Sequence, residues 1–200
     1  MAQNLVFIGD SITEDGRRID DPHDLGTGYV ARVAEWRAAA GADERVVNSG
    51  IGGDRAVDLA ARWDRDCLAH DPDVVSIHVG INDTWRRYDG GDATSTDAFE
   101  AVYRSLLMRA TDAGARLVLI EPFLLALTPE QAAWREDLDP KIEVVRALAR
   151  EFGATLVEAD AAFTRAGLTV DPATLLWDGV HPTDAGRDLL ARTWHETVAI

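Results

Sequence analysis

The sequence predicts an α/β protein in which a parallel sheet is covered by helices on both faces. Short runs rich in Val, Ile and Leu recur along the chain without alternating apolar and polar residues, which is typical of strands covered on both sides. Segments with helical periodicity separate these runs, and such alternation produces parallel strands joined by right-handed crossovers. No linker, repeat or change of composition interrupts residues 1–200, so we expect a single domain.

The order of elements follows from these patterns. The expected strands are Leu5–Ile8, Arg45–Asn48, Val74–Val79, Leu117–Ile120 and Thr155–Val157. The expected helices are roughly Gly28–Ala40, Arg55–Ala69, Asp97–Ala113, Lys141–Phe152 and Thr183–Thr197.

Local signals mark several helix ends. Asp97 with Glu100 has the spacing of a capping box, and Thr128-Pro129-Glu130-Gln131 combines a cap with a proline at the first helical position. Asp139-Pro140 repeats the cap-and-proline signal and predicts that a new helix starts there. Gly114 and Gly153 lie where helices are expected to end.

Charge and composition exclude several classes of protein. The net charge of −15, with 35 acidic against 20 basic residues, argues against a nucleic-acid partner. No run approaches the ~20 apolar residues needed to cross a membrane. The N-terminus lacks a basic segment followed by an apolar core, so we expect a cytoplasmic protein. Cys67 lies in a helical pattern and is expected to be a buried structural thiol rather than a reactive one.

An acidic segment near the N-terminus allows two interpretations. Asp20, Asp21 and Asp24 form the densest acidic cluster of the chain. We expect a solvated loop here, and the alternative is a cation site completed by His23.

Polar motifs stand at the expected ends of the strands. Gly9-Asp10-Ser11 follows the first strand, Asn48–Asp54 the second, and Gly80-Ile81-Asn82-Asp83 the third, while Trp177–Pro182 comes after the last strand. In open α/β sheets, ligands bind at the carboxyl edge of the strands. We therefore expect these four segments to converge on one site.

The residue types in these segments match the requirements of acyl transfer. Ser11 can act as the nucleophile, His181 as the base that takes its proton, and Asp178 as the group that orients His181. An oxyanion can be bound by the backbone N–H groups of Ser11 and Gly53 and by the side-chain amide of Asn82. Each motif also has an ordinary interpretation when it is taken singly. Gly9-Asp10-Ser11 can be a turn, the glycines up to Gly53 a turn or a phosphate-binding loop, Asn82-Asp83 a helix cap, and His181 a loop histidine. Their occurrence together, in this order, favours catalysis.

These segments resemble the sequence blocks of the SGNH hydrolase superfamily, the GDSL-type lipases and esterases. Gly9-Asp10-Ser11-Ile12 is similar to the first block, with Ile in place of Leu, and Gly53, Gly80–Asp83 and Asp178–His181 match later blocks. The resemblance implies a flavodoxin-like three-layer α/β/α fold with a five-stranded parallel sheet. It also implies a shallow, open site that uses no metal or cofactor.

A narrower likeness concerns the intracellular bacterial acetylxylan esterases of this superfamily, which remove acetyl groups from xylo-oligosaccharides and can form large homo-oligomers. It is carried by Leu25–Val30, Arg62-Trp63, Gly80–Asp89 and Leu176–Asp178. The resemblance implies a small-molecule ester substrate and a homo-oligomer. The candidate substrate-binding residues are Asp10, Tyr29, Trp85, Arg86, Tyr88 and Trp177.

The substrate class stays open at this point. Aromatic residues near the nucleophile favour a sugar ester, although Trp63 fits core packing better. Phe123–Leu127 can form a substrate wall or a buried or interfacial segment, and we favour a wall or an oligomer contact over an acyl groove. The alternatives to a carbohydrate esterase are another acyl hydrolase, of the thioesterase, lysophospholipase or arylesterase type, and a non-catalytic carbohydrate-binding module.

Overall fold

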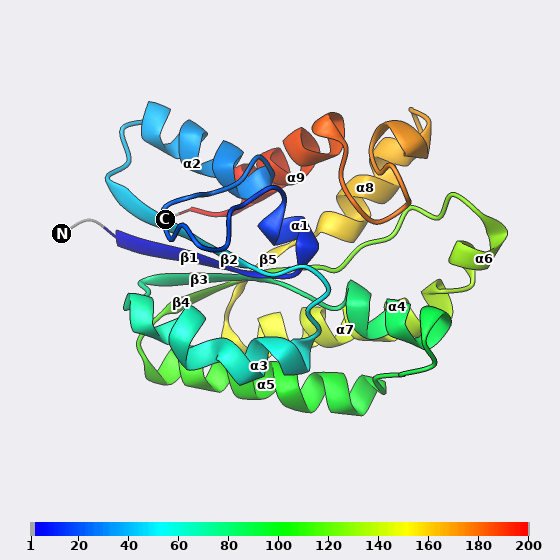
Figure 1. Ribbon diagram of the computed structural model, residues 1–200, viewed down its shortest axis with the longest axis horizontal. Coiled ribbons are helices and arrows are strands. Elements are labelled where there is room, and N and C mark those ends of the chain that lie inside the picture. Colours follow the sequence, from blue (N-terminus) through cyan, green and yellow to red (C-terminus); the bar gives the residue numbers. More distant parts are fainter. Residues whose placement is uncertain (1–2, 200) are drawn as a thin grey trace.

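A five-stranded parallel sheet forms the centre of the molecule, which a computed structural model describes for residues 3–199 (Figure 1). Its order, β2-β1-β3-β4-β5, is that of flavodoxin-like folds and confirms the predicted fold class. Gly9 at the end of β1 pairs with Gly50 of β2 on one side and His78 of β3 on the other. The strands are β1 (Gln3–Gly9), β2 (Glu44–Gly50), β3 (Val74–His78), β4 (Arg116–Ile120) and β5 (Thr155–Val157).

Helices cover both faces of this sheet. Figure 1 shows α2, α8 and α9 on one face and α3, α5 and α7 on the other, which gives three layers. The α-helices are α1 (Ser11–Glu14), α2 (Tyr29–Ala39), α3 (Ala56–Asp66), α4 (Ile81–Asp89), α5 (Thr96–Asp112), α6 (Pro129–Ala132), α7 (Arg135–Phe152), α8 (Ala159–Gly167) and α9 (Asp184–Thr197). Two short 3-10 helices are η1 (Leu68–His70) and η2 (Pro172–Thr174).

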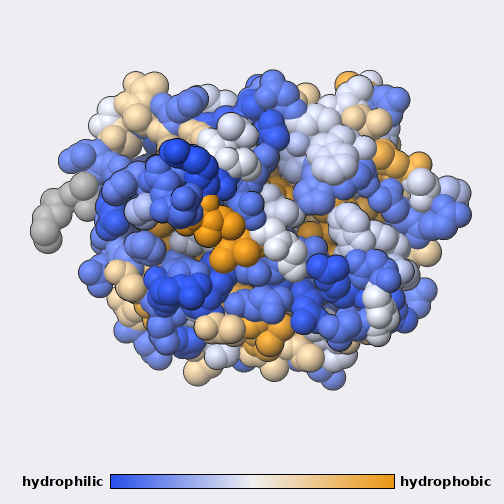
Figure 2. All heavy atoms as spheres, viewed as in Figure 1, coloured by the Kyte–Doolittle hydropathy of each residue, from blue (hydrophilic) through white to orange (hydrophobic). Residues whose placement is uncertain are grey.

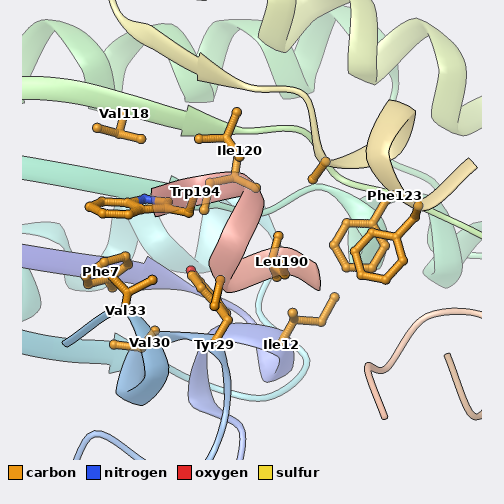
Figure 3. Close-up of a cluster of buried hydrophobic side chains, with 14 of the residues drawn as sticks. Phe7, Ile12, Tyr29, Val30, Val33, Val118, Ile120, Phe123, Leu190 and Trp194 are labelled. Carbon is orange, nitrogen blue, oxygen red and sulfur yellow. The ribbon is translucent and has the colours of Figure 1, made fainter. Parts of the chain in front are cut away.

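Successive strand residues pack into two different clusters, as the pleat of a strand requires. Leu5 and Phe7 join the cluster under α2 and α9, which Figure 3 shows around Trp194, whereas Val6 and Ile8 face α3 and α5. This burial on both faces explains the continuous apolar runs of the sequence. Trp63 is fully buried in the second cluster, as expected.

Two helix starts differ from the prediction. Helix α7 begins at Arg135 and contains Pro140, so the start predicted at Asp139-Pro140 is wrong. The turn before the proline is held by tertiary contacts, because Leu138 is buried in the core and Arg135 binds Asp160. The start of α5 also differs: Ser95, rather than Asp97, caps it by accepting a hydrogen bond from the Ala98 N–H.

Other local expectations are confirmed. The Thr128 hydroxyl accepts from the Gln131 N–H and caps α6, and Gly153 ends α7 in the left-handed conformation. Cys67 is buried and unpaired. Helices α1, α4 and α8 lie outside the predicted set; α4 begins in the polar segment that follows β3.

The surface is mainly hydrophilic, in agreement with the many charged residues of the sequence. On the face drawn in Figure 2, hydrophilic residues surround small, separate apolar areas. The acidic segment is an exposed loop in which Arg18 binds Asp21 and Asp24. Within residues 3–199, none of the helices is long and apolar enough to cross a membrane.

Candidate active site

Ser11 lies at the carboxyl edge of the sheet, directly after β1. Helix α1 begins at this residue, and the Asp10 side chain caps the helix by accepting from the Ile12 N–H at 3.0 Å. The strand end is tightly packed, because a Cβ added to Gly9 would lie 2.2 Å from the carbonyl oxygen of His78. Only glycine fits there, and the turn that follows presents the Ser11 hydroxyl at the sheet edge.

A chain of hydrogen bonds joins Ser11 to two residues far along the sequence. Ser11 Oγ lies 2.9 Å from His181 Nε2, and His181 Nδ1 lies 2.6 Å from Asp178 Oδ2. The other oxygen of Asp178 accepts the backbone N–H groups of Val180 and His181, at 3.0 and 2.7 Å. Both carboxylate oxygens are therefore occupied, which fixes the orientation of the imidazole.

These contacts shift the pKa values of the acid and the base in opposite directions. The hydrogen bond to Asp178 raises the pKa of His181 above its usual 6.5, although burial opposes the shift. Burial works to raise the pKa of Asp178, but hydrogen bonds from His181 and Val180 outweigh it and leave that pKa below its usual value. The carboxylate is thus charged when the imidazole takes up a proton.

We expect the activity of this site to depend on pH through His181. Only neutral imidazole can accept the Ser11 proton, so kcat/KM should fall as the pH falls through the His181 pKa, with a midpoint above 6.5. Initial rates with 4-nitrophenyl acetate, corrected for uncatalysed hydrolysis, measure this profile. A rate that stays flat between about pH 5 and 8 would contradict the role of His181.

Asp10 requires a control in this experiment. Burial raises the pKa of its carboxyl to about 7, although the hydrogen bond from Ile12 opposes the shift. Asp10→Asn keeps the shape and a helix-capping oxygen but removes the titration. In this variant we expect the midpoint to move down, because a nearby negative charge is lost, but the fall in activity at low pH should remain.

The segment after β2 forms a tight turn beside Ser11. The Asp54 N–H donates to the Ile51 carbonyl at 3.3 Å, and Gly53, the third residue of the turn, has a φ of +82° that favours glycine. A Cβ added to Gly52 would lie 3.8 Å from the Ser11 Cβ, so the turn lies against the serine. The Gly52 N–H donates to the Glu14 carboxylate, which ties the turn to α1.

Asn82 comes to the same place from the first turn of α4. It is buried, and its Nδ2 donates to the Asp54 carbonyl at 3.0 Å. A side-chain amide has two N–H donors, so one remains for a ligand. The next residue, Asp83, is buried and accepts the Ala56 N–H at 3.1 Å, which joins the start of α4 to the start of α3.

The segment with Asp178 and His181 reaches the site by a longer route than expected. Helices α8 and η2 separate it from β5, so it is the loop before α9 rather than a strand end. Gln131 supports this loop, since its Nε2 donates to the Asp178 carbonyl at 2.6 Å. In the sequence, Gln131 is recognisable only as part of a helix start, because no local signal connects it with Asp178.

Aromatic side chains border the imidazole. The Trp177 ring stacks on His181, with ring centroids 5.2 Å apart and planes at 16°, and Trp177 is 62% exposed. The ring centroids of Trp85 and His181 are 6.0 Å apart. Trp85 also contacts Trp134, which in turn stacks on Tyr88. Trp134 was missed, because only the fold brings it next to α4.

Arg86 lies at the edge of the turn after β2. A Cβ added to Gly53 would lie 3.4 Å from Arg86 Nη2, and the guanidinium also binds Asp89 at 2.9 Å. Arg87 differs, because it binds Asp137 at 3.1 Å. Arg86 is therefore the arginine of this pair that adjoins Gly53.

Two candidate substrate-binding residues lie inside the protein. Tyr29 is 1% exposed, packs edge-on against Phe7 and shares a hydrogen bond with Thr13 (Figure 3). Asp10 is fully buried. We therefore correct both expectations: Tyr29 is a core residue, and Asp10 supports α1 beneath the serine.

Of the alternatives for Phe123–Leu127, the start of the segment is buried and does not form the substrate wall that we favoured. Phe123 is fully buried, where it stacks on His78 and Phe163, and Leu124 is nearly as buried. Leu125 and Ala126 are half-buried, and Leu127 is exposed. In residues 3–199 no group of three or more His, Cys, Asp or Glu side chains is arranged to hold a metal ion.

Comparisons with known proteins agree with this geometry. A sequence model of the GDSL-like lipase/acylhydrolase family matches residues 7–189. An acetylxylan esterase from Geobacillus stearothermophilus is 40% identical over 202 aligned positions, which cover 96% of this chain and 92% of that protein.

Solved structures give the same relationship. The Geobacillus stearothermophilus acetylxylan esterase superposes with a TM-score of 0.89 at 37% identity, covering 99% of this chain and 94% of that one. Structures of its catalytic mutants include replacements of a serine, a histidine and an aspartate. A protein described as a GDSL-like lipase, from Parabacteroides merdae, superposes with a TM-score of 0.93 at 32% identity, covering 98% and 94% of the two chains.

Proposed function

This chain belongs to the GDSL-like lipase/acylhydrolase family, and from that premise we propose that it is a serine esterase that removes acetyl groups from xylo-oligosaccharides. The observation that carries the proposal is the continuous hydrogen-bond chain from Ser11 Oγ through His181 to Asp178. A neutral serine hydroxyl is a weak nucleophile, and such a chain is the arrangement that activates it. A related enzyme is described as an acetyl-xylooligosaccharide esterase, which supports the choice of substrate.

The proposed reaction has two halves. Ser11 Oγ attacks the ester carbonyl while His181 Nε2 takes its proton, and the new oxyanion is bound by the N–H groups of Ser11 and Gly53 and the free N–H of Asn82. The C–O bond of the ester then breaks, and His181 returns the proton to the departing sugar oxygen. Water repeats these steps on the acetyl-serine, so acetate leaves and Ser11 is restored.

The surroundings of the triad support a sugar as the alcohol part of the ester. We assign substrate contact to Trp85, Arg86, Tyr88 and Trp177, because aromatic faces pack on pyranose rings and a guanidinium can donate to hydroxyls. Trp134 extends this surface, since it contacts both Trp85 and Tyr88. The exposed side chains of Trp177 and Tyr88 are accessible to a ligand.

We expect a preference for short acyl chains. Phe123 and Leu124 are committed to the core, so these two side chains cannot line an apolar groove for a long acyl chain. The values of kcat/KM for 4-nitrophenyl esters from acetate to octanoate test this: they should be highest for acetate and fall as the chain lengthens. A maximum at octanoate would instead favour a lysophospholipase or thioesterase type of hydrolase.

The cellular compartment and the oligomeric state are further parts of the proposed function. We propose that residues 1–200 form one hydrolase domain that acts in the cytoplasm as a homo-oligomer. The buried, unpaired Cys67 is compatible with a reducing compartment. Leu168 is 82% exposed and is an apolar side chain that a subunit contact would cover. Native mass spectrometry gives the number of subunits, and a monomer at micromolar concentration would contradict the assembly.

A further inference from the structure

One buried arginine connects the backbone segments that carry the proposed oxyanion donors. Arg62 lies on α3 with 7% of its side chain exposed. Its Nη2 donates to the Gly9 carbonyl at 3.0 Å and its Nη1 to the Ser49 carbonyl at 2.7 Å. Its Nε donates to Asp54 Oδ2 at 2.7 Å, and Nη1 also reaches Asp66 Oδ2 at 3.2 Å.

Three of these four acceptors adjoin the site. Gly9 ends β1 and is two residues before Ser11, whereas Ser49 precedes the turn that contains Gly53 and Asp54 ends it. The backbone carbonyl of Asp54 accepts from Asn82 Nδ2. The guanidinium therefore binds Gly9, which is two residues before Ser11, and Asp54, which follows Gly53 and accepts from Asn82. In this way it is linked to all three oxyanion donors.

We propose that Arg62 is a positioning residue that holds the N–H groups of Ser11 and Gly53 and the amide of Asn82 in the geometry that binds the oxyanion. The inference rests on the proposed esterase function. A planar guanidinium donates along fixed directions, and bonds to charged donors are stronger than neutral ones, so this group can keep two strand ends and a turn at constant separation. A lysine ammonium has three donors on one flexible atom and cannot reach the same acceptors together.

The predicted defect concerns the transition state. Arg62 is buried and does not border the exposed aromatic surface, so its removal should leave KM nearly unchanged. Loss of a single oxyanion donor costs about 10²- to 10³-fold in kcat, and disordering the donor set should have a similar effect. The Ser11–His181–Asp178 contacts do not involve Arg62, so the pH midpoint of the reaction should stay in place.

The test compares Arg62→Ala and Arg62→Lys with wild type on 4-nitrophenyl acetate. We expect kcat to fall by about 10²-fold or more in Arg62→Ala and at least about 10-fold in Arg62→Lys, with KM within about 3-fold of wild type. Guanidinium chloride at tens of millimolar should restore part of the rate of Arg62→Ala. The matched control is Arg104→Ala on α5, which loses contacts to Glu100 and Glu151 away from the site and should keep its kcat with no response to guanidinium.

The outcomes separate positioning from general stability. If the thermal midpoint of Arg62→Ala falls but the kcat of its folded fraction equals that of wild type, Arg62 is merely structural and the inference is overturned. If Arg62→Ala does not fold, Arg62→Lys decides, and an unchanged kcat there overturns it equally. Failure of the proposed function looks different, because wild type and Ser11→Ala would then cleave the aryl acetate at the same rate.

Discussion

Replacing Ser11 with alanine is expected to lower kcat for 4-nitrophenyl acetate by about 10⁶-fold, the loss found when the nucleophile of a comparable serine hydrolase is removed. The reason is geometric, because Ser11 Oγ is the atom that His181 Nε2 contacts at 2.9 Å. His181→Ala should cause a loss of similar size, since an unactivated hydroxyl is hardly nucleophilic at neutral pH. The double variant should be no slower than either single variant, because the two residues act as one unit.

Matched variants show whether the loss is specific. Ser95→Ala removes a serine hydroxyl that caps α5, and His70→Ala removes a histidine of η1, so both alter local contacts without touching the triad. We expect wild-type kcat from both. A loss below about 100-fold in Ser11→Ala, with a normal thermal midpoint, would mean that another group performs the attack.

Asp178→Asn is expected to reduce kcat by about 10⁴-fold, the size of the effect of the same change in a serine-protease triad. The carboxylate accepts from His181 Nδ1, which keeps Nε2 free to take the serine proton. An asparagine amide can instead donate to Nδ1, and that favours the wrong tautomer. The hydrogen bonds from Val180 and His181 can be kept by the amide oxygen, so the loop should remain folded.

The same variant should change the pH profile. The hydrogen bond to Asp178 is the main cause of the raised His181 pKa, so the midpoint of the residual activity should move down. Circular dichroism and the thermal midpoint verify the fold. A loss smaller than about 10-fold with an unmoved midpoint would show that a different group orients His181.

The fold could be predicted from the sequence because its signals are local. Strands buried on both faces need continuous apolar runs, and Val6 and Phe7 show why: neighbouring residues face different helical layers, and both are fully buried. The helix that contains Pro140 could not be predicted in the same way. Its first turns are held by the burial of Leu138 and the ion pair of Arg135 with Asp160, which are long-range contacts.

The candidate site likewise contains some residues that could be predicted from local sequence and others that could not. Ser11, Gly53 and Asn82 lie within a few residues of the ends of β1, β2 and β3. Parallel strands bring such residues to one edge, so their convergence could be foreseen. Tyr29 was misplaced because its segment carries the family likeness, yet the side chain lies on the buried face of α2. Trp134 and Gln131 join the site from the segment after β4, and their roles depend on contacts with α4 and with the loop before α9.

The central claim is that Ser11 removes acetyl groups from a sugar. The most direct test is acetate release from acetylated xylo-oligosaccharides by wild type and Ser11→Ala, with 4-nitrophenyl acetate and octanoate measured alongside. We predict rapid release from the sugar by wild type, none above background from Ser11→Ala, and poor cleavage of the octanoate. Cleavage of the aryl esters without release from the sugar would contradict the carbohydrate substrate, and equal rates for both proteins would contradict the role of Ser11.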